Sequence, residues 1–138
     1  MPVRRATGCA LVLAIGLAAC GRQEDHANRN RPPASINVSA AITGARINVS
    51  PTSFGAGPIR LIVSNQTASA QALTFETGGA EAGLTQTTAP IDPSGTATLE
   101  LEVTEGGYEL STADGDLEPA AVEVGAPRPS AQNELLQP

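Results

Sequence analysis

The chain has 138 residues and a formal net charge of −6, with 14 acidic side chains against eight arginines and no lysine. An acidic chain without clustered basic side chains is a poor ligand for phosphate backbones, so this composition argues against nucleic acid as a partner. Only three side chains are aromatic and none is tryptophan. An exposed stacking platform for sugars or bases is therefore hard to build.

The N-terminus carries Arg4 and Arg5, followed by an apolar run from Ala6 to Ala19 that ends in Leu17-Ala18-Ala19-Cys20. A short apolar run behind two positive charges, followed by small residues, predicts a cleaved signal over residues 1–19. The tetrapeptide resembles the lipobox of bacterial lipoproteins. The resemblance implies cleavage before Cys20 and a diacylglycerol joined to its sulfur through a thioether. Two acyl chains give stable membrane anchoring, whereas one binds reversibly.

The rest of the chain divides into a linker, one domain and a tail. Residues 20–34 are polar and proline-containing, which predicts a flexible linker that begins at the lipidated cysteine. Residues 35–125 form a domain of ordinary size, and residues 126–138 have little apolar pattern and are predicted to be a disordered tail. Because the one cysteine left after cleavage carries lipid, the domain has no disulfide. His26, in the linker, is interpreted as a solvated side chain.

Apolar and polar residues alternate with period two through most of residues 36–124, which is typical of half-buried strands. Seven strands are predicted, around residues 36–40, 46–50, 58–65, 71–76, 96–103, 108–112 and 122–124. Turn residues separate them at 55–58, 78–79, 92–95, 106–107 and 114–115. Seven short strands without a helical period predict an antiparallel Greek-key β-sandwich.

The block from Ile47 to Val124 resembles the cupredoxin-like domains of bacterial envelope proteins. The shared features are an Ala-Gly-Pro turn at 56–58, a strand that ends in Asn65, a Pro-x-Gly-x-Thr-like entry at 93–96 and a Gly-x-Tyr-x-Leu run at 106–110. The resemblance implies a cupredoxin-like sandwich. It also implies where the copper ligands of the family would fall: Gln71, Thr112, Gly115 and Glu118.

None of these four residues can replace its counterpart. A blue-copper centre needs two imidazoles and a thiolate with a weak axial ligand, because soft and borderline donors select copper. The sequence therefore predicts a degenerate copper site and no cofactor. Gln71 and Thr112 are expected on the inward faces of their strands, bonded to each other or to nearby loops.

A second candidate metal site lies in the same region. Asp114, Asp116 and Glu118 alternate in a predicted loop, and hard oxygen ligands at such spacing can bind calcium. The segment lacks the length and the terminal glutamate of an EF-hand loop. A solvated acidic turn is the other interpretation.

The function expected from the sequence is that of a lipid-anchored, extracytoplasmic binding or accessory module of the bacterial envelope. It is not expected to be an enzyme, because the one histidine outside the signal is in the linker and nucleophilic catalysis needs a positioned base. Its expected location is the outer face of the cell membrane, or the outer membrane in a cell with two. Its expected partners are the membrane, through diacylglycerol, and an envelope protein. The alternative is a metal-handling lipoprotein that binds calcium or atypical copper.

Overall fold

A computed structural model describes residues 31–79 and 83–130. The predicted signal, the lipobox with Cys20, His26 and most of the linker lie outside these residues, as does the tail from residue 131. In the part of the chain that is described, no helix has the length and apolar character needed to cross a membrane.

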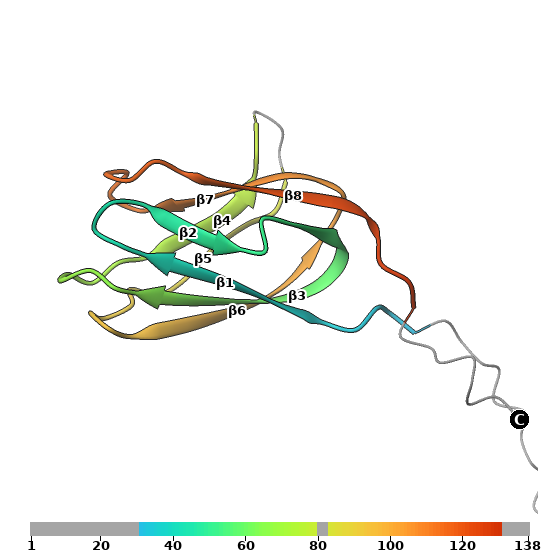
Figure 1. Ribbon diagram of the computed structural model, residues 1–138, viewed down its shortest axis with the longest axis horizontal. Coiled ribbons are helices and arrows are strands. Elements are labelled where there is room, and N and C mark those ends of the chain that lie inside the picture. The colour runs from blue at the N-terminus through green and yellow to red at the C-terminus, as the bar shows by residue number, and fades with distance from the viewer. Residues whose placement is uncertain (1–30, 80–82, 131–138) are drawn as a thin grey trace, which may run out of the picture.

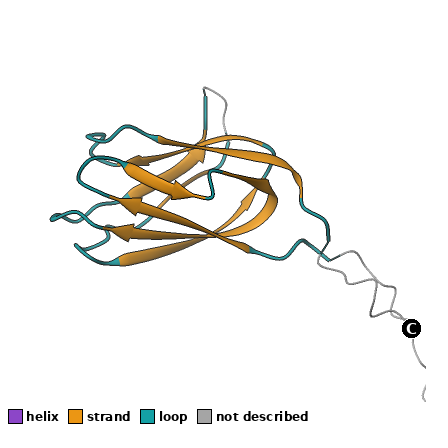
Figure 2. Ribbon diagram, in the orientation of Figure 1, coloured by secondary structure: helices purple, strands orange, loops and turns teal. Residues whose placement is uncertain are grey.

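The fold is a β-sandwich with two layers that share one strand (Figures 1 and 2). Its eight strands are β1 (Ile36–Ile42), β2 (Ile47–Ser50), β3 (Ser53–Asn65), β4 (Leu73–Thr77), β5 (Thr85–Thr87), β6 (Thr96–Val103), β7 (Gly106–Thr112) and β8 (Ala120–Pro127). One layer runs β2-β1-β3-β6, and the other runs β3-β8-β7-β4-β5. The predicted all-β sandwich is therefore confirmed.

The sheet is mixed, whereas the sequence predicted purely antiparallel pairing. Strand β3 pairs in parallel with β1 in one layer and with β8 in the other. Parallel neighbours need long crossovers, so they cannot be recognised from hairpin turns between consecutive strands. The strand that the prediction missed is β5, whose three residues are all exposed and show no apolar alternation.

The predicted turn at residues 55–58 is a corner inside β3 rather than a break between strands. The register of β3 shifts between Gly55 and Ala56, and Gly57 has a φ of +129°. At this corner the strand leaves the β8 layer and turns back into the β6 layer (Figure 1). Glycine suits the corner because it alone adopts such a positive φ without strain. The glycines at 106–107, also predicted as a turn, are the first residues of β7.

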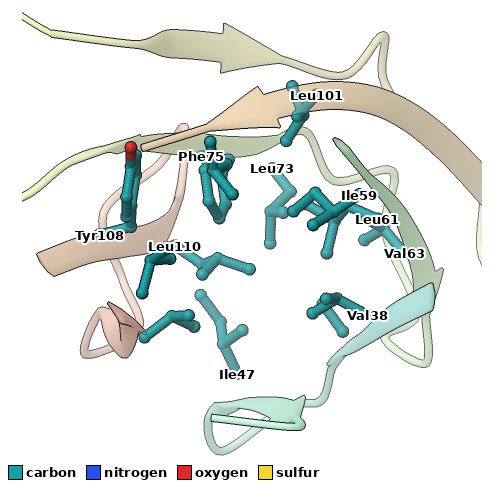
Figure 3. Packing of buried hydrophobic residues seen from close by; sticks show 14 of the residues in the cluster. Val38, Ile47, Ile59, Leu61, Val63, Leu73, Phe75, Leu101, Tyr108 and Leu110 are labelled. Atoms are coloured by element: carbon teal, nitrogen blue, oxygen red, sulfur yellow. The ribbon is translucent and has the colours of Figure 1, made fainter. Parts of the chain in front are cut away.

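The core lies between the two layers and is built from the inward rows of the alternating strands (Figure 3). Ile59, Leu61 and Val63 of β3 are fully buried. From the other layer, Phe75 stacks on Tyr108 with ring centroids 5.1 Å apart. The period-two pattern predicted the inward rows of the strands, whereas Ala56, at the corner of β3, and Ile91, in a connection, are buried without such a pattern.

Both ends of the described chain meet at one end of the sandwich, here called the terminal end (Figure 1). Strand β8 extends to Pro127, two residues beyond the predicted domain boundary at 125. The Ser130 hydroxyl donates to the Arg31 carbonyl (2.6 Å), which brings the two ends of the described chain side by side. The opposite end, here called the distal end, carries the connections 43–46, 66–72, 88–95 and 113–119.

The terminal end is held by Arg128. Its guanidinium donates to the carbonyls of Gly55 (3.0 Å), Pro58 (2.6 Å) and Ala34. A Cβ on Gly55 would lie 2.7 Å from Arg128 Cγ, and one on Gly57 would lie 2.9 Å from Arg128 Nη2. Glycine at these positions therefore also makes room for the arginine that clasps the corner of β3.

Candidate functional site

The four positions aligned by resemblance with copper ligands lie at the distal end. Gln71 lies two residues before β4, and Thr112 ends β7. Gly115 and Glu118 follow in the 113–119 connection, where both are exposed. Thr112 pairs with Leu73, and the Ala113 amide donates to the Ala72 carbonyl (3.2 Å). The antiparallel register thus continues past the ends of the strands and brings Gln71 opposite Asp114.

Gln71 binds Asp114 directly. The Gln71 Nε2 donates to Asp114 Oδ2 at 3.0 Å, and the same nitrogen lies 3.4 Å from Ser69 Oγ. This amide and, secondarily, the Thr112 hydroxyl hold the pKa of the Asp114 carboxyl below its ordinary value of 3.8. Asp114 is therefore an anion at neutral pH. Of the two arrangements expected for Gln71, the bond to a nearby loop is the one present.

Thr112 is nearly fully buried, with 5% of its surface exposed. Although its hydroxyl is close enough to lower the pKa of Asp114, Oγ1 makes no hydrogen bond of ordinary geometry. The contact with Asp114 is thus a loose one, and Gln71 is the partner that fixes the carboxylate.

These residues do not fit copper. An amide, a hydroxyl, a glycine and a carboxylate offer neither imidazole nor thiolate, and copper in this fold needs both. Within residues 31–79 and 83–130, no group of three His, Cys, Asp or Glu side chains lies close enough to hold a metal ion.

The acidic loop is likewise not gathered into a metal site. Asp114, Asp116 and Glu118 are all exposed, and the described residues contain no metal-binding group that includes them. Asp114 is directed toward Gln71, while Leu117 between the other two acids packs against the core. In the structure the segment is an exposed acidic connection with one leucine packed against the core.

One residue that organises the distal end was noted in the sequence only as part of a motif. Asn65 is fully buried at the end of β3, and its Nδ2 donates to the carbonyls of Ser69 (2.7 Å) and Ile91 (2.8 Å). Its Oδ1 accepts from the amide (2.9 Å) and the hydroxyl (2.7 Å) of Thr67. The Asn-x-Thr spacing is a signal of such a side-chain turn. The long-range bond to Ile91 has no signal in the sequence.

Comparison with solved structures finds similar chains at low sequence identity. Rusticyanin in its reduced form shares 13% identity over 65% of this chain and 79% of its own, with a TM-score of 0.50. Reduced auracyanin from Roseiflexus castenholzii has 14% identity, a TM-score of 0.47, and coverage of 66% of this chain and 96% of its own. An amicyanin variant with Cu(I) has 13% identity, a TM-score of 0.48, and coverage of 70% and 94%.

No protein-family model and no curated protein sequence matches the chain. At 13% identity the likeness to rusticyanin concerns the fold alone. The fold is cupredoxin-like, as the sequence predicted.

Proposed function

We propose that this chain is a lipid-anchored, extracytoplasmic binding module of the bacterial envelope, whose cupredoxin-like sandwich carries no copper and catalyses no reaction. The anchor is supported by the lipobox-like sequence that ends at Cys20. The location follows from the anchor, because lipidation of this kind takes place on exported chains.

The observation that carries the proposal is the Gln71–Asp114 hydrogen bond at the distal end. In a copper carrier this region would hold imidazole and thiolate ligands, whereas here an amide and a carboxylate satisfy each other. Because these two polar groups bond to each other, they support a role in binding a partner by surface shape and charge rather than in electron transfer through a metal.

The placement of the chain ends also supports presentation to a partner. The Arg128 guanidinium bonds the backbone at Ala34, so the chain that leads back to Cys20 leaves from the terminal end. The distal connections lie at the opposite end of the sandwich (Figure 1). An N-terminal anchor therefore leaves the distal loops on the side away from the attachment point.

Cross-linking of the full-length lipoprotein in intact cells tests the proposal, with Cys20→Ala as a control that cannot be lipidated. We expect one stoichiometric envelope protein to be captured with the native chain and lost with the control. Membrane release of the native chain, or an identical capture profile for both chains, would contradict it.

Titration of Cu²⁺ and Ca²⁺ into the purified protein tests the metal-handling alternative. We expect no saturable binding of either ion. Tight one-to-one binding that is lost in Asp116→Ala would replace the proposed function with a metal-handling one.

A further inference from the structure

The distal end of the sandwich is tied together by side chains from two positions. Asn65 joins the 66–70 segment to the connection before β6 through Ser69 and Ile91. Gln71 joins that same connection through paired backbone bonds with Ile91, of 3.0 and 2.8 Å. Its side chain then reaches Asp114 in the connection between β7 and β8. Three connections distant in sequence are thereby linked.

The β7–β8 connection is held both by Leu117, which packs against the core, and by the side-chain link to Gln71. In residues 113–119 the backbone bonds that fix the segment are Ala113 to Ala72 (3.2 Å) and Gly115 to Thr112 (3.0 Å), both at its start. The side-chain hydrogen bond that joins this connection to the segment before β4 is that of Asp114 to Gln71. The other groups that act on the Asp114 carboxyl are Thr112, which ends β7, and the backbone of Asp114 and Asp116. Exposed backbone with few bonds opens locally at low free-energy cost, so a single side-chain bond has a large effect on its shape.

We propose that Gln71 and Asp114 form a metal-free latch, which holds the β7–β8 connection in one conformation where the resemblance would place a metal ion. The donor lies just before β4 and the acceptor just after β7, at the ends of the two strands that a shared metal would join, and they bond without it. A neutral amide that donates to a carboxylate is a charge-assisted hydrogen bond, stronger than one between neutral groups. In the proposed function, the purpose of the latch is to keep the distal loop ready for its partner.

If the latch exists, the amide donor at position 71 and the carboxylate acceptor at position 114 can be exchanged without loss of the bond. Gln71→Glu preserves shape but replaces the donor by a second carboxylate, which repels Asp114. Asp114→Asn introduces an amide of the same size. The double variant Gln71→Glu/Asp114→Asn restores one donor and one acceptor in reversed order, so it re-forms the bond with unchanged side-chain lengths.

Hydrogen exchange of the backbone amides of Ala113 and Gly115, which donate to the carbonyls of Ala72 and Thr112, tests this prediction by NMR on the chain from Gly21 to Pro138. The core lies within residues 38–124, so this chain contains the whole sandwich. We expect Gln71→Glu to speed exchange by up to about tenfold, the range that loss of one hydrogen bond gives. The double variant should recover most of the protection.

Gln66→Glu is the matched control, because it makes the same chemical change at an exposed position of the distal end. Equal exchange in Gln71→Glu and Gln66→Glu would overturn the latch, and so would a double variant no better protected than Gln71→Glu. The measurement needs no partner, so failure of the latch is distinguishable from failure of the proposed function. A latch that is confirmed while cross-linking captures nothing would refute the proposed function alone.

Discussion

Replacing Asn65 by alanine should cost more stability than any other change of a single polar side chain at the distal end. The side chain is fully buried and makes four hydrogen bonds, two as donor and two as acceptor. Each such bond contributes about 1 kcal/mol net, and the groups left behind are poorly solvated. Asn65→Ala should therefore lower the free energy of unfolding by about 4 kcal/mol, a large share of the 5–15 kcal/mol typical of a domain.

Urea denaturation followed by circular dichroism measures this loss, and a second variant separates the two halves of the network. Asn65→Asp keeps the bonds to Thr67 but sets a buried carboxylate oxygen against the carbonyls of Ser69 and Ile91, which repel it. It therefore tests the donor half of the network, and the loss should be at least as large as in Asn65→Ala. Asn37→Ala, an exposed asparagine on β1, is the control and should change stability by less than about 0.5 kcal/mol. If Asn65→Ala were within 1 kcal/mol of that control, by the scale of one such bond, the bonding network would not stabilise the fold as argued.

Three further predictions concern the corner, the carboxylate and the copper positions. Gly57→Ala should destabilise the fold by about 1–3 kcal/mol, because φ is +129° and the new Cβ would lie 2.7 Å from Pro33 Cγ. The control is Gly44→Ala, which has open space around it and should leave the thermal unfolding temperature nearly unchanged. Because folding lowers the pKa of Asp114, the ionised carboxylate stabilises the fold above pH 3.8, and this stabilisation is lost as the pH falls through the pKa of the folded state. The free energy of unfolding, measured against pH, should show this loss in the native chain and not in Asp114→Asn. Installing the four copper ligands at the aligned positions should create a copper–thiolate absorption band. The band should be absent when the cysteine is omitted. A folded, copper-loaded variant without this band would show that the four positions do not converge on one ion. The substitutions are Gln71→His, Thr112→Cys, Gly115→His and Glu118→Met.

The sequence predicted those parts of the fold in which one face of a strand is buried. Burial alternates along β1, β6 and β7, and their buried residues are apolar except for Thr112. The pattern fails where burial does not alternate. Thr85–Thr87 is exposed on both faces, and the glycine-rich start of β3 is typical of a turn although it continues as strand. Which layer a residue joins at such a corner depends on tertiary partners such as Arg128, and these are 70 residues away in sequence.

The candidate site, like the fold, was predicted in part from the sequence. The resemblance located Gln71 and Thr112 at one end of adjacent strands, where the structure has them. It did not identify Asp114 as the partner of Gln71, because that pairing depends on the β4–β7 register continuing past the last assigned pair. The acids of the 113–119 connection, interpreted from spacing alone, are exposed and form no metal-binding group within the described residues, and Leu117 among them packs against the core. The spacing of acidic residues in a loop does not determine where their side chains point, whereas an apolar residue packed against the core does.

The position of Ala34 has a mechanical consequence. A pull on the N-terminal segment first loads the bond between the Arg128 guanidinium and the Ala34 carbonyl, and then β1 along its own axis. Strand β1 lies between β2 and β3, in a seven-residue parallel register with β3. Force in that direction shears all of these backbone bonds at once instead of opening them one at a time. A pull through an N-terminal anchor would therefore load the β1–β3 ladder in shear.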